Sequence, residues 1–298
     1  MPSLFAPGMV STMFAEWNTS FTPDARTVFF SRGAFWTIMT STRVKGKWSP
    51  PEVASFSGRW MDTDPFVSPD GRRVYFTSNR PLDGNPDTPP LADSGIWYVE
   101  RAATGDWSQP INVGSTINGH GSAWFPSVTR DGTLYFHARR DGGKGSSDIY
   151  CTRWLGDRYA DAIPVDFNTA ASEQEPYVAP DESYMIFVSD RAGGSGGGDL
   201  YVSIRREGHW GTPMNLGQPV NSYATDMAPS VSPDGGTLYF TSSRRPFHGA
   251  RPGRVDAASF MKELASYENG SLKMYSIAFD AAALRGVRQA RAVPSTGQ

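Results

Sequence analysis

The sequence predicts an all-β protein: a five-bladed β-propeller of four-stranded antiparallel blades, with a short helical insertion in the last blade. Three observations lead to this prediction. A segment built around an aspartate in a turn recurs five times, Gly and Pro number 31 and 23, and aromatic residues make up 13% of the chain. Turn residues and aromatic residues at this frequency favour many short strands over long helices.

Each repeat unit reads as four strands. In "DTDPFVSPDGRRVYFTSNR" (62–80), a first strand runs into the turn Pro69-Asp70-Gly71 and a second strand follows it. A third strand carries an aromatic residue, as in "GIWYVER", and a fourth lies in segments such as "PINVGSTIN". The turn aspartates are Asp24, Asp70, Asp131, Asp181 and Asp234, separated by 46, 61, 50 and 53 residues. This period matches one propeller blade, and radial repetition of such sheets protects their edges.

The blades are expected at about 14–56, 57–116, 117–167, 168–220 and 221–293, within a single domain that covers residues 1–298. The last unit lacks the Trp-x-x-Pro segment found in other units, so its outer strand needs another source. We expect "VRQARAV" (287–293) to supply this strand, with the N-terminal "LFAPGMV" as the alternative.

Two connections between second and third strands are long and should lie on one face of the propeller. Residues 81–95 are Pro-rich and predict an irregular loop. Residues 246–271 predict a helix that Asp256 caps and Asn269-Gly270 ends. Phe260, Leu264 and Tyr267 would share one face of this helix. Packing over the last blade and a lid over a site are both open interpretations.

The repeats resemble the WD40-like PD40 repeats of TolB-type propellers. The resemblance covers about residues 14–280 and rests on "W-x-x-P-x-N-L-G-x-x-x-N", "P-x-x-S-P-D-G-x-x-L-Y-F-T-S-x-R" and "G-G-G-D-L-Y-V". It implies a periplasmic or secreted protein, although no signal peptide is visible and a cytoplasmic location is the alternative. It also raises envelope proteins as possible partners. Because propellers serve as binding scaffolds and as several kinds of enzyme, the resemblance does not define a function.

Carboxylates and arginines recur at fixed positions of the units. The position eight residues before each turn aspartate holds Glu16, Asp62, Ala123, Glu173 and Asp226. Two residues further on stand Asn18, Asp64, Phe125, Glu175 and Ala228. After the second strands come Arg32, Arg80, Arg139 with Arg140, Arg191, and Arg244 with Arg245. We favour pairing of each acid with an arginine; the alternative is a carboxylate cluster in which one raised pKa provides an acid beside a base.

The third unit replaces the acids with "GHGSAWFP", which contains His120, Trp124 and Phe125. Trp17 occupies the position of Trp124 in the first unit. Aromatic faces beside carboxylates and arginines suit sugar rings or peptide side chains, although these aromatic residues could instead plug the channel.

These patterns predict a monomeric propeller that binds a glycan fragment or a peptide at the acidic and aromatic mouth of its channel. The expected ligand-binding residues are Glu16, Trp17, Asp62, Asp64, Arg80, His120, Trp124, Glu173, Glu175, Arg191 and Asp226. The first alternative is a glycosidase-type hydrolase, whose catalytic carboxylates would come from Asp62, Asp64, Glu173 and Glu175. The second alternative is a protein-interaction scaffold of the cell envelope.

Composition excludes several other classes. The net charge of −2 provides no general attraction to nucleic acid or anionic membranes, and no apolar run is long enough for a membrane-spanning helix. The dispersed histidines lack zinc spacing, so no metal ligands or cofactors are expected. Calcium at the acidic mouth is the one metal that the oxygen ligands would suit.

Overall fold

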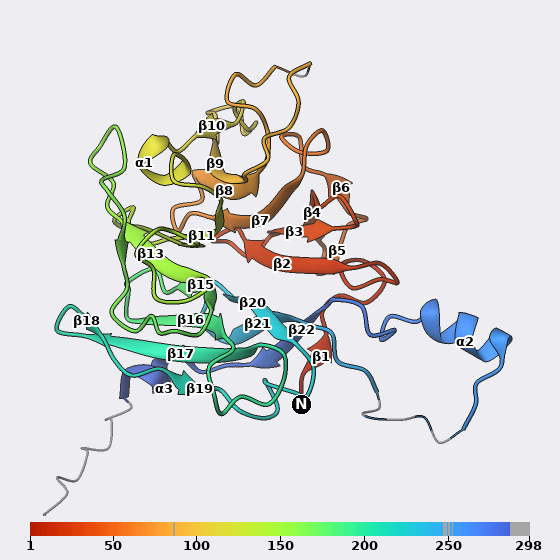
Figure 1. Cartoon of the computed structure of the whole chain (residues 1–298). Helices are drawn as coiled ribbons and strands as arrows, with labels where there is room; N and C mark the ends of the chain where they lie inside the picture. Colours follow the sequence, from red (N-terminus) through yellow and green to blue (C-terminus); the bar gives the residue numbers. More distant parts are fainter. Residues whose placement is uncertain (86, 247–248, 250, 252, 287–298) are drawn as a thin grey trace, which may run out of the picture.

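The computed structural model describes the chain except for residues 86, 247–248, 250, 252 and 287–298. Five antiparallel sheets surround a central axis, which confirms the predicted five-bladed propeller (Figure 1). The first strand of each sheet lies innermost, and each inner strand contacts the inner strands of the two neighbouring blades. Helices are short in the described part of the chain: α1 (Ser115–Asn118), α2 (Ala257–Leu264) and α3 (Ala281–Gly286).

The blades follow one another along the chain. The first contains β2 (Glu16–Phe21), β3 (Thr27–Arg32), β4 (Thr37–Val44), β5 (Lys47–Trp48) and β6 (Glu52–Val53). The second contains β7 (Asp62–Val67), β8 (Arg73–Ser78), β9 (Gly95–Glu100) and β10 (Ile111–Asn112). The third contains β11 (Ala123–Val128), β12 (Leu134–Ala138), β13 (Asp148–Thr152) and β14 (Ile163–Pro164). The fourth contains β15 (Glu173–Val178), β16 (Tyr184–Ser189), β17 (Asp199–Arg206), β18 (His209–Trp210) and β19 (Met214–Asn215).

The fifth blade is closed by the N-terminus. It contains β20 (Asp226–Val231), β21 (Thr237–Ser242), β22 (Lys273–Ala278) and, as its outer strand, β1 (Ser3–Leu4). Leu4 pairs with Tyr275 in antiparallel register. The C-terminal closure that we expected is therefore corrected to the N-terminal alternative, and residues 287–293 lie outside the described residues. The physical reason is that this strand brings Phe5 against Phe21 of the first blade and Tyr239 of the fifth.

The turns between first and second strands form by local hydrogen bonding. Asp70 Oδ1 accepts from Ser68 Oγ (2.6 Å) and from the backbone N–H of Arg72 (3.0 Å). Gly71 follows with φ 70°, a conformation that glycine adopts without steric cost. Equivalent hydroxyl-to-aspartate bonds occur in the turns of the first, third and fifth blades. In the fourth blade the hydroxyl comes from Ser183, two residues after Asp181.

The hydrophobic core is divided into five clusters, each of which fills the interface between two neighbouring blades. Strands such as β16 are buried along their whole length because both faces of a blade pack against a neighbouring blade. This packing holds the inner strands, and with them the lining of the channel, in fixed positions.

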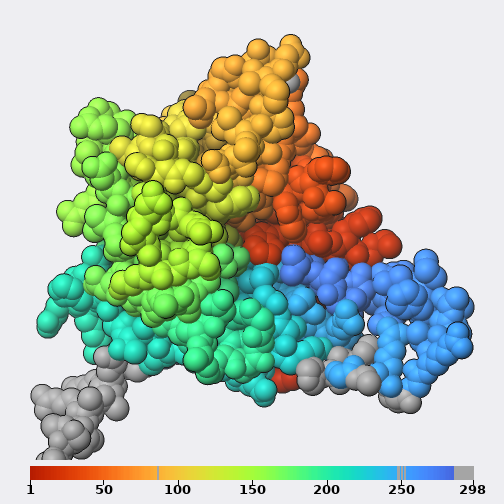
Figure 2. All heavy atoms as spheres, in the orientation of Figure 1, coloured from red at the N-terminus to blue at the C-terminus, as the bar shows by residue number. Residues whose placement is uncertain are grey.

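The insertion that contains α2 extends from the side of the propeller (Figure 1; blue, to the right in Figure 2). Asp256 caps α2 as predicted, by accepting a hydrogen bond from the backbone N–H of Ser259. The predicted end at Asn269-Gly270 is corrected, because α2 ends at Leu264 and Tyr267 lies beyond it. Phe260 and Leu264 remain 42% and 41% exposed, so the helix is not packed over the last blade through this face. Asn269 anchors the end of the insertion by donating to the carbonyl of Met13 (3.0 Å).

Candidate functional site

A β-bulge interrupts all five inner strands at the same aligned position. We call the residues at this position the bulge residues: Asn18, Asp64, Phe125, Glu175 and Ala228. All five are non-glycine residues with φ between 45° and 55°, and all are buried. In four blades the next residue is proline, which cannot donate to a strand ladder and is tolerated at bulges. Backbone strain of this kind persists only where the surrounding structure enforces it, and it is frequent at functional sites.

The bulge turns Asp64, Phe125 and Glu175 into a cavity of about 350 Å³ at the mouth of the channel. We call it the channel-mouth cavity. The other lining residues come from the inner strands, from the second strand of the third blade and from the loops above them: Trp17, Trp36, Met61, Thr63, Trp124, His137 and Gln174. The cavity therefore combines three indole rings with two carboxyl groups, and in the part of the chain that the structure describes no lysine or arginine lines it.

Asp64 is held by neutral donors. Its Oδ1 accepts hydrogen bonds from Trp17 Nε1 (2.8 Å) and Thr63 Oγ1 (3.2 Å). Burial raises the pKa of Asp64 to about 6, and these hydrogen bonds together with one from Thr77 oppose the increase. A carboxyl group with this pKa is mostly ionised at pH 7 and can act as a base or as a hydrogen-bond acceptor.

Glu175 is held differently. Burial raises its pKa to about 8, and the nearby charge of Asp64 contributes to the increase. Its Oε2 accepts the backbone N–H of Ala228 (2.6 Å) in the next blade. At pH 7 Glu175 is therefore mostly protonated, whereas Asp64 is mostly ionised.

The bond from Ala228 to Glu175 has a structural origin. In three blades the backbone N–H of the bulge residue donates to a hydroxyl group of the preceding blade. Asn18 donates to Thr241, Asp64 to Ser31, and Phe125 to Thr77. Val188 occupies the aligned position in the fourth blade and cannot accept a hydrogen bond. Glu175 supplies the missing acceptor, so its carboxyl group serves the fold as well as the cavity.

His137 is a neutral part of the cavity wall. It pairs with Trp124 across β11 and β12, and its Nδ1 lies 2.9 Å from Ser147 Oγ. Desolvation lowers the pKa of His137 to about 3. The imidazole is therefore uncharged at physiological pH and does not neutralise the two carboxyl groups.

The acids at the start of the inner strands lie outside this cavity. They form ion pairs with arginines of their own blades: Glu16 with Arg32 (3.3 Å), Asp62 with Arg80 (2.6 Å), Glu173 with Arg191 (2.9 Å) and Asp226 with Arg244 (2.7 Å). All four carboxylate side chains are fully buried. This geometry matches the pairing interpretation and separates Asp62 and Glu173 from Asp64 and Glu175.

The remaining predicted residues are divided between two places. Trp17 and Trp124 line the channel-mouth cavity together with Asp64 and Glu175. His120 instead lines a separate cavity beside the third blade. Among the described residues, no group of three or more His, Cys, Asp or Glu side chains is placed to hold a metal ion.

Sequence reasoning missed Trp36, Met61, Thr63, His137 and Gln174. Thr63 and Gln174 occupy the aligned position of Trp17 and Trp124, so the repeat alignment could have identified them. Trp36 belongs to a loop, and no repeat position predicts its place in the cavity.

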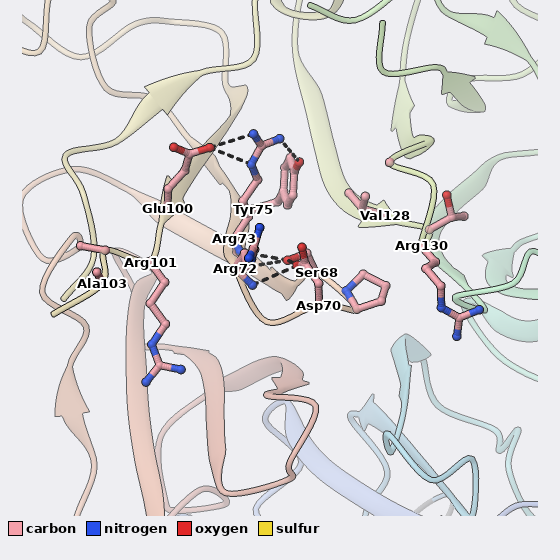
Figure 3. Close-up of a pocket in the computed structure, with 14 residues that line it drawn as sticks. Ser68, Asp70, Arg72, Arg73, Tyr75, Glu100, Arg101, Ala103, Val128 and Arg130 are labelled. Atoms are coloured by element: carbon pink, nitrogen blue, oxygen red, sulfur yellow. Dashed lines mark hydrogen bonds and ion pairs between the residues drawn. The ribbon is translucent and has the colours of Figure 1, made fainter. Parts of the chain in front are cut away.

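A further cavity, of about 550 Å³, opens at the opposite end of the strands, near the turn of the second blade (Figure 3). Arg73 is bound there to Glu100 (2.7 Å) and to the hydroxyl of Tyr75 (3.3 Å). Arg101 and Arg130 extend from opposite walls (Figure 3). Asp70 is used by its own turn. This cavity lacks the buried, unneutralised groups that distinguish the channel mouth.

Comparison with known proteins supports the fold. No protein-family model and no curated protein sequence matches the chain. Among solved structures, TolB from Acinetobacter baumannii is similar with a TM-score of 0.53 and 17% identity, covering 78% of this chain and 50% of that one. A protein described as "putative TolB" from Agrobacterium tumefaciens has a TM-score of 0.52 and 15% identity, with 90% and 91% covered.

A thermostable family-43 glycoside hydrolase is also similar, with a TM-score of 0.50 and 14% identity, covering 77% of this chain and 83% of that one. This chain spans half the length of the Acinetobacter protein. Likeness at these identities concerns the fold alone, which is a TolB-like propeller. Within the described residues, no helix is long and apolar enough to cross a membrane.

Proposed function

We propose that the protein is a ligand-binding propeller whose channel-mouth cavity holds a glycan fragment or a peptide segment. The observation that carries the proposal is the combination of three indole rings with the Asp64 and Glu175 carboxyl groups in one cavity of about 350 Å³. Indole faces pack against the apolar faces of sugar rings and against peptide side chains, while a few polar groups fix orientation. PD40 membership and a cell-envelope location are parts of this proposal, supported by the TolB-like fold.

The charge of the cavity restricts the ligand. Asp64 is mostly ionised at pH 7, and no lysine or arginine among the described residues lines the cavity to balance it. An anionic ligand group would therefore be repelled, whereas hydroxyl groups and protonated amines would be accepted. Neutral or amino sugars and basic peptide side chains are the expected ligands.

Binding to glycan and peptide arrays tests this proposal. The wild-type protein should bind a subset of one array, and Asp64→Asn and Trp124→Ala should each weaken that binding about tenfold or more. Asp106→Asn, which changes an exposed carboxylate in an outer hairpin, is the matched control and should bind as the wild type does. Unchanged binding by both cavity variants would place the ligand elsewhere and overturn the proposal.

A glycosidase-type hydrolase is the second candidate, favoured by one observation. The pKa values of Glu175 and Asp64 are about 8 and about 6, which leaves an acid beside a base at neutral pH. Glu175 would protonate the leaving oxygen and Asp64 would act as nucleophile or base. Activity would then be highest between pH 6 and pH 8. Turnover lost in both Glu175→Gln and Asp64→Asn would support the enzyme, while binding without turnover of any bound glycan would leave the binding module.

A further inference from the structure

Three blades share one way of holding an arginine. Arg80, Arg191 and Arg244 each donate from Nε to a serine at the end of the second strand, at 2.9–3.0 Å. Each also donates from Nη2 to the acid at the start of the inner strand, at 2.6–2.9 Å. The guanidinium lies over aromatic rings of the second and third strands, as Arg244 does over Phe240 and Tyr275. This arrangement is a built carboxylate-binding position that the protein fills with its own side chain.

The third blade keeps the arginine and loses its partners. Arg140 lies over Phe136 and Tyr150, at 5.1 and 4.9 Å from the ring centroids. Its Nη2 donates to the carbonyl of Ile117 (3.1 Å), as Nη2 of Arg244 does to that of Val220. The guanidinium therefore occupies the same place in its blade as Arg244 does.

In the third blade, alanine residues occupy both positions that hold the acid and the serine in the sister blades. Ala123 replaces the acid and Ala138 replaces the serine, as the strand register shows. Arg140 Nε is buried without a hydrogen-bond partner, and Arg140 forms no ion pair in the part of the chain that the structure describes. The Arg140 side chain is half-buried, with its Nε enclosed, and it can still form an ion pair with a carboxylate from outside the chain.

This arginine borders open space. A cavity of about 780 Å³, which we call the blade-three cavity, is lined by Arg140 and Tyr150, by His120 and by Arg139. Glycines on both sides, among them Gly119 and Gly142, let a ligand approach the backbone closely. Asp141 is the one carboxylate that lines this cavity; it is exposed and forms no ion pair among the described residues. Nearby Asp148 is engaged within its own loop, because its Oδ2 accepts a hydrogen bond from the backbone N–H of Lys144 (2.8 Å).

We propose that the blade-three cavity binds a carboxylate group of a small ligand, with Arg140 as the principal contact. The ligand's carboxylate pairs with Arg140 from the cavity side, since Ala123 and Ala138 are buried and do not line the cavity. Arg139 adds positive charge at the opening. This site is separate from the channel-mouth cavity and stands whether or not the proposed function of that cavity holds.

The repeat itself offers the test. Ala123→Asp restores the internal carboxylate of the sister blades, while Ala123→Asn adds nearly the same volume without charge. Acetate and D-glucuronate are titrated at constant ionic strength into the ¹⁵N-labelled protein, with inorganic phosphate in parallel, and the Arg140 Nε–H resonance is followed. The resonance is assigned with Arg140→Lys, and near-ultraviolet circular dichroism checks that each variant is folded.

The wild type and Ala123→Asn should show saturable shifts with similar affinity for the carboxylates. Ala123→Asp should bind about tenfold more weakly or not at all, because its own carboxylate occupies the guanidinium. Asp64→Asn should bind as the wild type does. Equal binding by Ala123→Asp and the wild type overturns the proposal, as does the absence of a saturable response to either carboxylate. A response to phosphate alone contradicts the assignment of a carboxylate ligand.

Discussion

Single residues at one repeated position carry different tasks in this propeller. Among the bulge residues, Asn18 donates to the carbonyl of Pro65 (3.2 Å), and Asp64 faces the channel-mouth cavity. Glu175 faces the same cavity and also accepts the N–H of Ala228, because Val188 offers no hydroxyl there. The carboxyl group with the raised pKa is thus also the hydrogen-bond acceptor for the backbone N–H of Ala228.

Glu175→Gln should change how stability depends on pH. Burial raises the pKa of Glu175 to about 8 from its ordinary value of 4.5, so between these values the folded state keeps a proton that the unfolded state has released. The wild type therefore loses stability as pH rises through this window, by on the order of 5 kcal/mol from this group. Gln keeps the acceptor for Ala228 and cannot ionise, so urea unfolding should show a flatter profile from pH 5 to 9. Exposed Glu52→Gln is the control, and parallel profiles for all three proteins would contradict the assignment.

At the scale of the element, the inner strand begins with a buried ion pair in four of the five blades. Asp62 and Arg80 are the most enclosed of these pairs, with side chains 0% and 3% exposed. Burial raises the pKa of Asp62, and the charge of Arg80 opposes that increase. Such a pair contributes little net stability when it is complete, but removing one partner leaves the other as an unpaired buried charge.

Arg80→Met should therefore destabilise the protein by about 3–5 kcal/mol, because Asp62 is left buried without its cation. The double variant Asp62→Asn/Arg80→Met should recover most of that loss, since neither charge remains. Denaturant unfolding at pH 7 of the two single variants and the double variant completes the cycle. A cost below about 1 kcal/mol for Arg80→Met would mean that the pair does not organise the strand.

At the scale of the whole molecule, the ring is closed where β1, near the N-terminus, pairs with β22, near the other end of the described chain. β1 completes the sheet of the fifth blade, and the following residues, including the fully buried Val10, pack against the first blade. Phe5 lies between these blades, with its ring centroid 4.9 Å from that of Tyr239 and 6.0 Å from that of Trp48. Closure therefore depends on a hydrophobic contact between blades as well as on one short strand pair.

Phe5→Ala should lower the free energy of unfolding by about 2 kcal/mol, because it removes a half-buried ring from the closing interface. Amide exchange should become faster in β22, whose outer neighbour is β1. Phe35→Ala removes a ring that is 86% exposed and should have little effect on either measurement. If the two variants behave alike, closure does not depend on Phe5.

The sequence by itself determined the features that depend on local chemistry repeated five times. The turns follow from aspartates and hydroxyls two residues apart, and the blade count and the acid–arginine pairs follow from the alignment of units. Only the tertiary structure decided which end closes the ring and which carboxylates face the cavity. Asp62 and Asp64 are two residues apart, yet a backbone bulge places one in an ion pair and the other in the channel mouth. The reason is that a bulge and a blade interface depend on neighbouring strands that are distant in sequence, as Trp36 and His137 also show.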